Sequence, residues 1–371
     1  ELQGSAQAEL ASLSLQVLER NLSPAFAIFA DLVRNPVFPQ QEIDRERQLR
    51  LDDLAQQANN ANALSDRIGK MLLFGRNHPY GRPLSGLPAT VEPITRADLA
   101  RFHEDRWRPG GSALIFAGDI TLAAAVQLAQ AHFGSWSGAA PPAIPIPEPQ
   151  PVGSGRVFVV DRQDAAQTLI ALLQPGPARD AADYYAFNLA NTVWGGGFSS
   201  RLLLNLREDK GYSYGVYAFP AFYRQGGSWI AFGGVQTDKT KESIVEFNSE
   251  LLNIAGRKPI TQAELTEAKE NRVRGYAQEF RSLGQVAGQV ARLWSYGLPM
   301  SELQRYPGEI DRVTVESVNK TAQKHAAPGK ATLLLIGDYR KIAAGLRELD
   351  LGRITMLDVL GDPIAQHGSE R

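Results

Sequence analysis

Hydrophobic and polar residues along the chain follow two periods, one typical of strands and one typical of helices. Strand-like alternation or short apolar runs occupy residues 11–18, 157–161, 168–173, 213–219 and 227–236. Large apolar residues at helical spacing follow in both halves of the sequence, at Phe26, Phe29, Val33, Ile244, Phe247 and Leu251. Strands followed by helices predict an α+β fold, with helices on one side of an antiparallel or mixed sheet.

Capping residues indicate where several helices begin and end. Ser23 is predicted to be an N-cap, with Pro24 at the first helical position. Thr261 and Glu264 form a Thr-x-x-Glu capping box, and Gly211 is expected to end a helix. Two further helices are expected over residues 183–195 and 199–209.

A proline-rich segment over residues 138–155 divides the chain into two halves with matching features. Its six prolines favour an extended, semi-rigid spacer over any packed element. The string YGRPLSG begins at Tyr80 and YGLPMSE at Tyr296, while SALIFAGD ends at Asp119 and ATLLLIGD at Asp338. Because these features recur in the same order, we predict an internal duplication in which each half closes on a buried strand before Gly-Asp.

The duplication predicts two α+β domains, each with a mostly antiparallel sheet covered by helices. The expected parts are a first domain, a proline-rich linker, a complete second domain and a tail, over residues 1–137, 138–156, 157–355 and 356–371. The second half opens with a segment over residues 156–226 that the first half lacks. We therefore expect the first domain to lack its opening strand and helix segment, and the chain to begin inside that domain.

Composition excludes several classes of function. The 371 residues suggest two or three domains at about 150 residues each, and 43% hydrophobic with 21% charged residues is typical of a globular protein. A formal net charge of -1 gives no basic excess to bind nucleic acid or an anionic membrane. The absence of cysteine excludes disulfides, thiolate metal sites and cysteine nucleophiles. No apolar run approaches the ~18 residues of a membrane span.

Metal-binding patterns are missing from the sequence. The five histidines include no pair at i, i+4 spacing and no HExxH or HxxEH motif, so we expect no zinc site within this chain. His103, beside Glu104 and Asp105, is interpreted as part of a solvated helix face. Glu46 and Asp53 share a helix face two turns apart, but the arginines between them favour surface ion pairs.

The three glycines Gly195 to Gly197 resemble an anion-binding loop at a helix N-terminus only superficially. No Lys-Ser/Thr of a phosphate loop and no GxGxxG spacing follows, so we favour a flexible turn with Ser199 or Ser200 as the N-cap. A phosphate-ligand enzyme using these glycines stays as a rival hypothesis, which predicts protection by nucleotides in thermal melting.

Arg207 and Tyr214 are the remaining candidates for chemistry. Arg207 is expected near a helix end and Tyr214 on the following strand. Guanidinium and phenol groups on adjacent elements are donors suited to the backbone carbonyls of an extended peptide. Taken alone, the pattern favours a surface arginine paired with Glu208 or Asp209 and an ordinary strand tyrosine.

The string GGGFSSRLLLNLREDKGYSYGV, which begins at Gly195, resembles the Ser-Arg-Leu…Leu-Arg-Glu…Gly…Tyr signature of the pitrilysin/insulinase family of zinc metallopeptidases. NPVFPQQEIDRER, NHPYGRPLSG and the strands ending in Gly-Asp support the resemblance, which covers nearly all of residues 1–350. This family includes mitochondrial processing peptidase, and its duplicated α+β domains form two halves that close around an unfolded peptide. One half carries the zinc helix HxxEH with a later glutamate, and the other supplies an Arg/Tyr pair that grips substrate.

The resemblance assigns Arg207 and Tyr214 as that substrate-binding pair, because both residue types and their spacing match. It places Glu46 and Asp53 at the positions of the supporting glutamate and of the zinc-ligand glutamate. Asp53 departs from the pattern, since its side chain is shorter. The resemblance therefore implies that this chain binds no cofactor, that zinc lies in a partner or in a segment preceding Glu1, and that the chain alone is inactive.

The function implied by the resemblance is a substrate-binding, non-catalytic half or subunit of a zinc metalloendopeptidase. Its partners would be a peptide substrate and a zinc-bearing catalytic half or subunit of the same family. An active subunit whose zinc helix precedes Glu1 stays open, although Asp53 favours the non-catalytic interpretation. The alternative is an inert assembly subunit of the same fold, against which Arg207 and Tyr214 argue. The resemblance also favours a bacterial periplasm or envelope, although nothing in the sequence assigns a compartment.

Overall fold

The computed structural model describes residues 1–152 and 156–364, which divide into two compact units. The first unit comprises Glu1–Leu54, Leu84–Pro145 and Gly275–Gln304. The second unit comprises Ala55–Pro83, Ile146–Arg274 and the chain from Arg305 onward. The units group segments from both halves of the sequence, and the expected domain boundaries at residues 137 and 157 stay a prediction.

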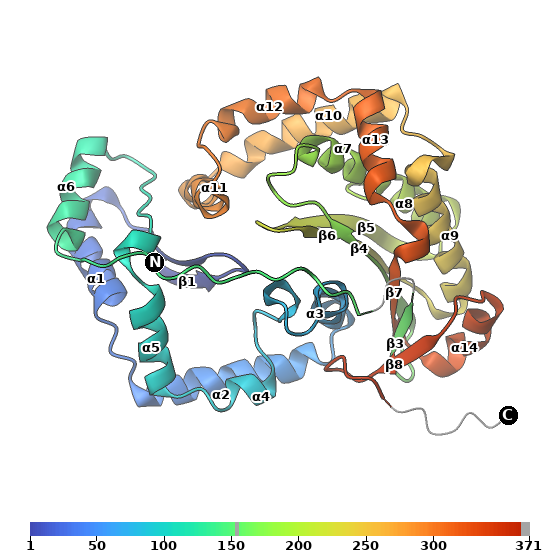
Figure 1. The fold of residues 1–371 in the computed structure, drawn as a ribbon, viewed down its shortest axis with the longest axis horizontal. Coiled ribbons are helices and arrows are strands. Elements are labelled where there is room, and N and C mark those ends of the chain that lie inside the picture. The colour runs from blue at the N-terminus through green and yellow to red at the C-terminus, as the bar shows by residue number, and fades with distance from the viewer. Residues whose placement is uncertain (153–155, 365–371) are drawn as a thin grey trace. The chain divides into compact units, whose positions relative to one another are not determined.

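A six-stranded mixed sheet lies at the centre of the second unit, in the order β5-β6-β4-β7-β3-β8 (Figure 1). Its strands in chain order are β3 (Val157–Asp161), β4 (Gln167–Gly176), β5 (Ser213–Phe222), β6 (Gly227–Gln236), β7 (Thr332–Gly337) and β8 (Ile354–Leu357). The pairs β5-β6, β6-β4 and β4-β7 are antiparallel, while β3 runs parallel to β7 and β8. This antiparallel-rich sheet with its helices confirms the predicted α+β fold class.

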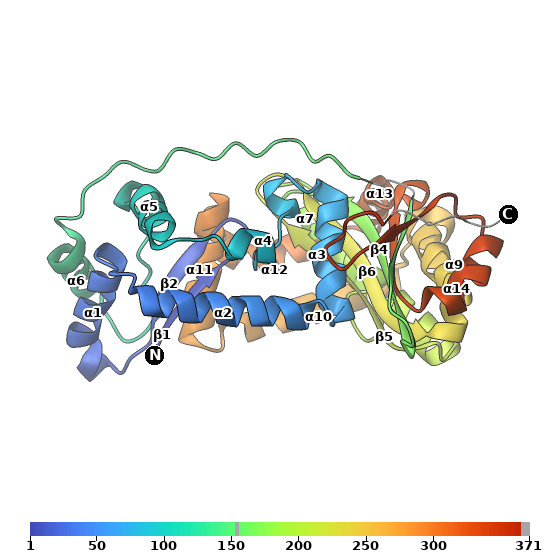
Figure 2. The same ribbon diagram turned by 90° about the horizontal axis from the view of Figure 1, so that it is seen from below.

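Helices cover both faces of this sheet, whereas the sequence predicted helices on one side only. Leu169 and Leu173 of β4 pack in one buried cluster with Leu64 and Ile68 of α3 (Ala61–Phe74). Figure 2 shows α3 crossing this face, and α7 and α9 contact strands from the opposite side. Because successive strand residues point to opposite faces, the continuous apolar run of β4 needs cover on both. Replacing Leu64, which is 0% exposed, with alanine would cost roughly 2–5 kcal/mol.

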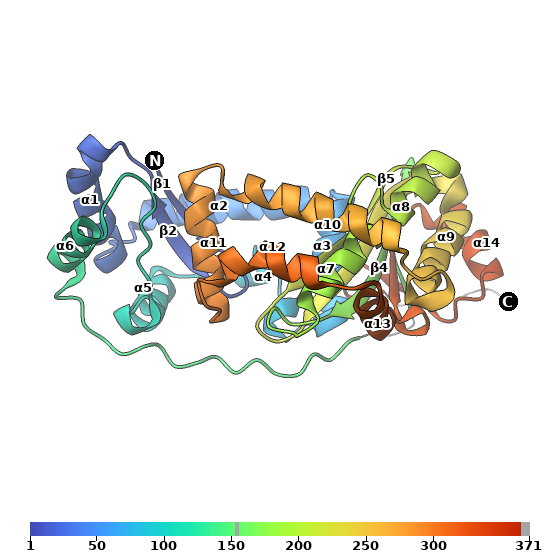
Figure 3. The same ribbon diagram turned by 90° about the horizontal axis from the view of Figure 1, so that it is seen from above.

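The other main helices lie wholly or mostly in the second unit. They are α7 (Tyr184–Trp194), α8 (Arg201–Leu203), α9 (Thr240–Leu252), α10 (Gln262–Tyr276), α12 (Glu302–Arg312), α13 (Val315–His325) and α14 (Tyr339–Glu348). The helices α10 and α12 lie side by side (Figure 3), where the Lys269 ammonium donates to the Asp311 carbonyl at 2.6 Å. Within residues 1–152 and 156–364, no helix combines the length and apolar character needed to cross a membrane.

The first unit holds a small aromatic core next to a two-stranded antiparallel ribbon. Its elements are β1 (Leu2–Ala6), β2 (Ala11–Leu15), α1 (Leu22–Arg34), most of α2 (Gln40–Gln57), α4 (Pro88–Val91), α5 (Arg96–Arg106), α6 (Leu122–Phe133) and α11 (Leu283–Tyr296). Phe26, Phe29 and Val33 of α1 are buried as predicted, and α1 packs against α6 (Figure 2). The prediction of Ser23 as N-cap was wrong, because α1 begins at Leu22. Pro24 is tolerated there since first-turn amides have no intrahelical acceptor.

The expected strand at residues 112–119 does not form. These residues have no β-ladder partner, although their apolar pattern matches that of β7. By contrast, β7 lies between β4 and β3 and is buried throughout. A strand requires neighbouring N–H and C=O groups, which an apolar pattern cannot supply by itself. The prediction that both halves close on a buried strand is therefore wrong for the first half.

The proline-rich linker lacks helix and strand from residue 138 to 152, but part of it is packed. The amides of Gln150 and Val152 donate to the carbonyls of Phe74 and Leu72 of α3, at 3.2 and 2.9 Å. Prolines lack the amide donor, yet the other linker residues keep theirs and can bond to a helix end. The segment expected to be an extended, unpacked spacer is thus partly bonded to α3 of the second unit. The expected tail from residue 356 also overlaps β8, and its residues 365–371 lie outside the described part.

Candidate functional site

Arg207 lies in a π-helix, η4 (Leu204–Asp209), which continues directly from α8. The amide of Lys210 donates to the carbonyl of Asn205, five residues back, at 3.0 Å. Single π-turns of this kind are rare and occur frequently at functional sites. Gly211, with a φ of 66°, follows the helix in the left-handed conformation. The sequence therefore placed both Arg207 and the helix end correctly.

Tyr214 is the extra residue of a β-bulge in β5. Ser213 pairs with Val235 and Gly215 pairs with Gly234, so Tyr214 has no partner of its own on β6. The Ser213 hydroxyl holds the bulge, donating to the Gly234 carbonyl at 2.6 Å and accepting from the Gly215 amide at 3.1 Å. A bulge redirects one side chain out of the strand's alternation. Tyr214 is consequently 84% exposed.

The structure brings Arg207 and Tyr214 together. The Arg207 Cζ atom lies 5.1 Å from the centroid of the Tyr214 ring, within the range of a cation–π contact. Arg207 Nε also lies 3.2 Å from a carboxylate oxygen of Glu208, the surface ion pair that the residue pattern alone favoured. Since guanidinium carries five N–H donors, this pairing leaves the terminal nitrogens for a further acceptor.

A buried arginine fixes the start of the segment that carries Arg207. Arg201 is 9% exposed, and its Nε and Nη2 donate to the two carboxylate oxygens of Glu264 at 2.7 and 2.8 Å. It also donates to the carbonyls of Lys258 and Pro259 at 2.6 and 3.1 Å. Such a bidentate pair is both strong and directional. We call Arg201 and Glu264 the clamp; it holds α8, and η4 after it, against the N-terminus of α10.

The same carboxylate caps α10, as the sequence predicted. The Glu264 carboxylate accepts from the Thr261 amide at 2.9 Å, and the Glu264 amide donates to the Thr261 hydroxyl at 3.3 Å. Burial raises the pKa of Glu264, but the hydrogen bonds from Arg201 and Thr261 outweigh burial and lower the pKa to about 2. Glu264 is therefore ionised across the neutral range.

Gly195 and Gly196 of the glycine turn are packed closely, in contrast to the flexible turn that was expected, while Gly197 lies in open space. The Gly195 carbonyl accepts from the Ala218 amide of β5 at 2.7 Å, and a Cβ on Gly195 would lie 2.5 Å from the Ala218 Cβ. Ser200 occupies the predicted N-cap position of α8, but its hydroxyl donates back to the Gly197 carbonyl at 2.6 Å. The glycines thus allow a close approach to the strand edge.

Glu46 and Asp53 lie on α2 and pair with arginines of the same helix. Carboxylate oxygens of Glu46 and Asp53 lie 2.5 Å from Arg45 Nη2 and 3.5 Å from Arg50 Nη1. Both carboxylates are about half exposed or more. This arrangement agrees with the solvated, ion-paired face that the interleaved charges favoured.

The described histidines contact backbone, an aspartate or aromatic rings. His78 Nε2 lies 2.9 Å from the Pro147 carbonyl, and His103 Nε2 lies 2.7 Å from the Val33 carbonyl. His325 Nε2 lies 2.9 Å from Asp183 Oδ2, and the fourth, His132, stacks edge-on against Phe26. His367 lies outside the described residues. Within the described ranges, no three His, Cys, Asp or Glu residues gather as a metal site would require.

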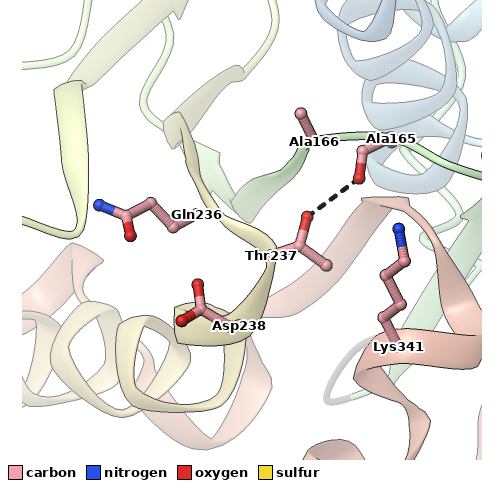
Figure 4. A pocket seen from close by; sticks show the side chains of 6 residues that line it. All are labelled: Ala165, Ala166, Gln236, Thr237, Asp238 and Lys341. Atoms are coloured by element: carbon pink, nitrogen blue, oxygen red, sulfur yellow. Dashed lines mark hydrogen bonds between the residues drawn. The ribbon is translucent and has the colours of Figure 1, made fainter.

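A hollow of about 590 Å³ lies beside the start of α9 (Figure 4). Its lining residues are Ala165, Ala166, Gln236, Thr237, Asp238 and Lys341. The Thr237 hydroxyl donates to the Ala165 carbonyl at 3.2 Å, which links the strand end to the facing loop. The hollow contains none of the residues that the sequence put forward and no nucleophile with an adjacent base.

Sequence reasoning missed a group of aromatic residues near Tyr214, which we call the aromatic shelf. The shelf consists of Phe198, Tyr217, Phe219 and Phe232. Ring centroids lie 6.5 Å apart for Phe198 and Tyr217, 6.2 Å for Tyr217 and Phe219, and 5.8 Å for Phe219 and Phe232. The alternation of Tyr217 and Phe219 is visible in the sequence, because residues i and i+2 share one face of a strand.

Comparison with known proteins identifies the family. Residues 93–272 match the family described as the peptidase M16 inactive domain. A Mycobacterium leprae protein named an uncharacterized zinc protease is 30% identical over 324 residues, covering 83% of this chain and 69% of that protein. The chain belongs to the M16 peptidase family. A second relative, a Mycobacterium tuberculosis protein named an uncharacterized zinc protease, is 30% identical over 339 residues, covering 90% of this chain and 76% of that protein.

Solved structures agree with the M16 assignment. The crystal structure of a peptidase M16 inactive domain from Pseudomonas fluorescens has a TM-score of 0.81 at 26% identity, covering 91% of this chain and 80% of that one. A chain of complex III from Candida albicans has a TM-score of 0.79 at 14% identity, which shows the shared fold alone. The M16 family is the pitrilysin/insulinase family that the sequence resembles, and the matched inactive domain includes Arg207 and Tyr214.

The two residues that the resemblance places at the zinc positions, Glu46 and Asp53, do not fit a zinc site among the described residues. Glu46 and Asp53 are paired with Arg45 and Arg50, and the described histidines are bonded elsewhere. Zinc in proteins takes nitrogen, sulfur or oxygen ligands from a cluster of several side chains. No catalytic step through zinc is therefore assigned to residues 1–152 or 156–364.

Proposed function

We propose that this chain is the substrate-binding, non-catalytic half or subunit of a zinc metalloendopeptidase that encloses unfolded peptides. A zinc-bearing partner or preceding half of the same family would cleave the peptide. The observation that carries the proposal is the contact between Arg207 and the exposed Tyr214, held by a π-helix and a β-bulge. Its support from known proteins is the match to an M16 inactive domain and the zinc proteases among the relatives.

In this proposal, Arg207 donates to a backbone carbonyl of an extended peptide, and the Tyr214 hydroxyl makes a second hydrogen bond. The ring of Tyr214 keeps the guanidinium plane in place, so little side-chain freedom is lost when peptide binds. Hydrogen bonds to a charged group contribute about 1.5–3 kcal/mol each. Positioning by two such groups would hold the peptide for cleavage by the catalytic half.

Peptide binding tests this role directly. We expect a fluorescein-labelled, unstructured peptide of about twenty residues to bind the chain in fluorescence anisotropy titrations. Arg207→Ala should raise its Kd at least tenfold, because a charged hydrogen bond is lost. The Kd of Arg207→Lys should lie between those of the wild type and Arg207→Ala, since lysine keeps the charge but lacks the planar guanidinium group. Tyr214→Phe should raise the Kd by a smaller factor, because it keeps the ring and loses only the hydroxyl.

A matched control is Arg274→Ala, which removes an exposed arginine of α10 that pairs with Glu270 at 2.8 Å. This variant should bind the peptide like the wild type. Turnover by a zinc-bearing M16 half added in trans gives a second measurement, in which Arg207→Ala should slow cleavage. Unchanged peptide affinity and unchanged turnover in Arg207→Ala would remove Arg207 from the binding site.

The second candidate function is a catalytically inert assembly subunit. The observation that favours it is the fold shared with a chain of complex III from Candida albicans. An assembly subunit requires neither Arg207 nor Tyr214 at an exposed position. No measurable peptide binding by the wild-type chain, together with stable association with a partner, would favour this alternative.

A further inference from the structure

Two residues of the aromatic shelf, Tyr217 and Phe219, lie on β5, the strand that also carries Tyr214. A Cβ on Gly215 would lie 2.9 Å from Tyr217 Cε2, so the Tyr217 ring folds back over Gly215 toward the bulge. Phe198 meets the same ring nearly at a right angle, and Phe232 is the cross-strand partner of Tyr217 on β6. The shelf therefore extends from the bulge along one face of the sheet.

The α3 cluster covers this face at β4, and Phe232 packs against that cluster, but two residues of the shelf beyond it are exposed. Phe198 is 76% exposed and Phe219 is 52% exposed, whereas Val216 and Ala218, on the other face of β5, are buried. The whole of β5, Ser213–Phe222, contains no charged residue. Single exposed apolar residues are ordinary, but a contiguous aromatic group marks a binding surface.

The edge of β5 is closed to an added strand at its centre. The Ala218 amide is already bonded to the Gly195 carbonyl, and Pro220 has no amide hydrogen. A peptide beside β5 therefore cannot form a continuous backbone ladder there. Recognition along this part of the site must come from side chains, and the side chains available are the aromatic shelf.

We propose that the aromatic shelf binds an aromatic side chain of the same extended peptide whose carbonyl Arg207 holds, and so selects peptides that carry one. This inference rests on the proposed function. Tyr217 lies three residues beyond Tyr214 in β5.

An aromatic occupant fits this surface better than an aliphatic one. Rings attract each other edge to face, because the positive edge of one meets the negative face of another. The Phe198–Tyr217 contact already has this geometry, with an interplanar angle of 88°. A third ring can pack edge to face against the exposed Phe219 in the same way. Because β5 contains no charged residue, an uncharged ring that covers it takes no charge of β5 out of water.

The experiment compares three fluorescein-labelled peptides of about twelve alanine, serine and glutamine residues that differ at one central position. That position carries phenylalanine, leucine or alanine, and Kd is measured by anisotropy with the full 371-residue chain. We expect the phenylalanine peptide to bind about tenfold more tightly than the alanine peptide, with the leucine peptide between them. Phe219→Ala should bring this ratio close to one while the alanine peptide keeps its Kd.

Phe198→Ala provides a second variant, because this exposed side chain lies in a turn and its loss should not disturb folding. The control is Phe102→Ala, which removes an exposed phenylalanine of α5 in the first unit and should preserve the wild-type ratio. Equal affinity for all three peptides, with Arg207→Ala still weakening each, would overturn the shelf and leave the proposed function intact. If Phe219→Ala weakened binding of all three peptides equally, the proposed role of the aromatic shelf would also be overturned. If the wild-type chain bound none of the peptides, both the role of the shelf and the proposed function would be overturned.

Discussion

At the clamp, Arg201 shows how burial changes the contribution of an ion pair. Its guanidinium is shared between the carboxylate of Glu264 and two carbonyls, and it has little contact with solvent. Arg274 and Glu270, on the same helix α10, form an exposed pair of the kind that contributes about 0–1 kcal/mol. Removing one partner of a buried pair costs more, because the remaining charge stays away from water.

We predict that Glu264→Gln lowers the free energy of unfolding by about 2 kcal/mol at pH 7, below the full cost of a buried pair because Glu264 keeps 30% exposure. The folded pKa of Glu264 is about 2 against an ordinary 4.5. Its stabilisation is therefore complete above pH 4.5 and is lost as the pH falls toward 2. Urea unfolding at pH 7, 5 and 3 should show the gap between wild type and variant narrowing only in the acidic range.

Glu270→Gln is the control for this measurement and should change stability by no more than about 0.5 kcal/mol at any of these pH values. A gap for Glu264→Gln that is as large at pH 3 as at pH 7 would contradict an ionised clamp. It would mean that packing, and not charge, accounts for the effect of Glu264.

At the scale of the elements, the glycine turn and β5 are held in place by close packing against each other. A Cβ on Gly195 would lie 2.7 Å from the Ala218 amide nitrogen and 3.0 Å from Leu202 Cδ1, while nothing lies within 4 Å of one on Gly197. We predict that Gly195→Ala destabilises the protein by about 1–3 kcal/mol, since backbone must shift, and that Gly197→Ala stays within about 0.5 kcal/mol. Thermal melting of both variants measures the difference. Equal effects would contradict this packing, and a shift of the wild-type melt by nucleotides would revive the phosphate-loop hypothesis.

Some elements could be predicted from the sequence pattern alone, whereas others depend on tertiary contacts that the pattern does not contain. β3 and β6 match the predicted ranges because apolar runs bounded by turn residues define both ends. Residues 112–119 carry an equally good pattern but no partner, and pairing is not encoded in local spacing. The same limit applies to the site. Arg207 and Tyr214 could be named from a motif, but the aromatic shelf depends on the register of β5 with β6 and on the packing of the turn.

At the scale of the whole molecule, the two units differ in how much core they possess. The central cluster of the first unit has only Phe26, Phe29 and Val33 fully buried, among the described residues. The second unit buries both faces of its central strands, and β7 is buried at every position. Since stability follows buried apolar area, the second unit should open less often than the first.

We predict that amides of β7 exchange with deuterium at least tenfold more slowly than those of α1, which corresponds to a difference in opening free energy of about 1.4 kcal/mol or more. Leu64→Ala, which opens a cavity in the second unit, should accelerate exchange in β7 and leave α1 unchanged. Mass spectrometry of peptides spanning residues 26–33 and 332–337 measures the exchange of α1 and of β7, in the wild type and in Leu64→Ala. Equal protection of the two segments in the wild type, or equal acceleration of both by Leu64→Ala, would show that the units open as one cooperative structure.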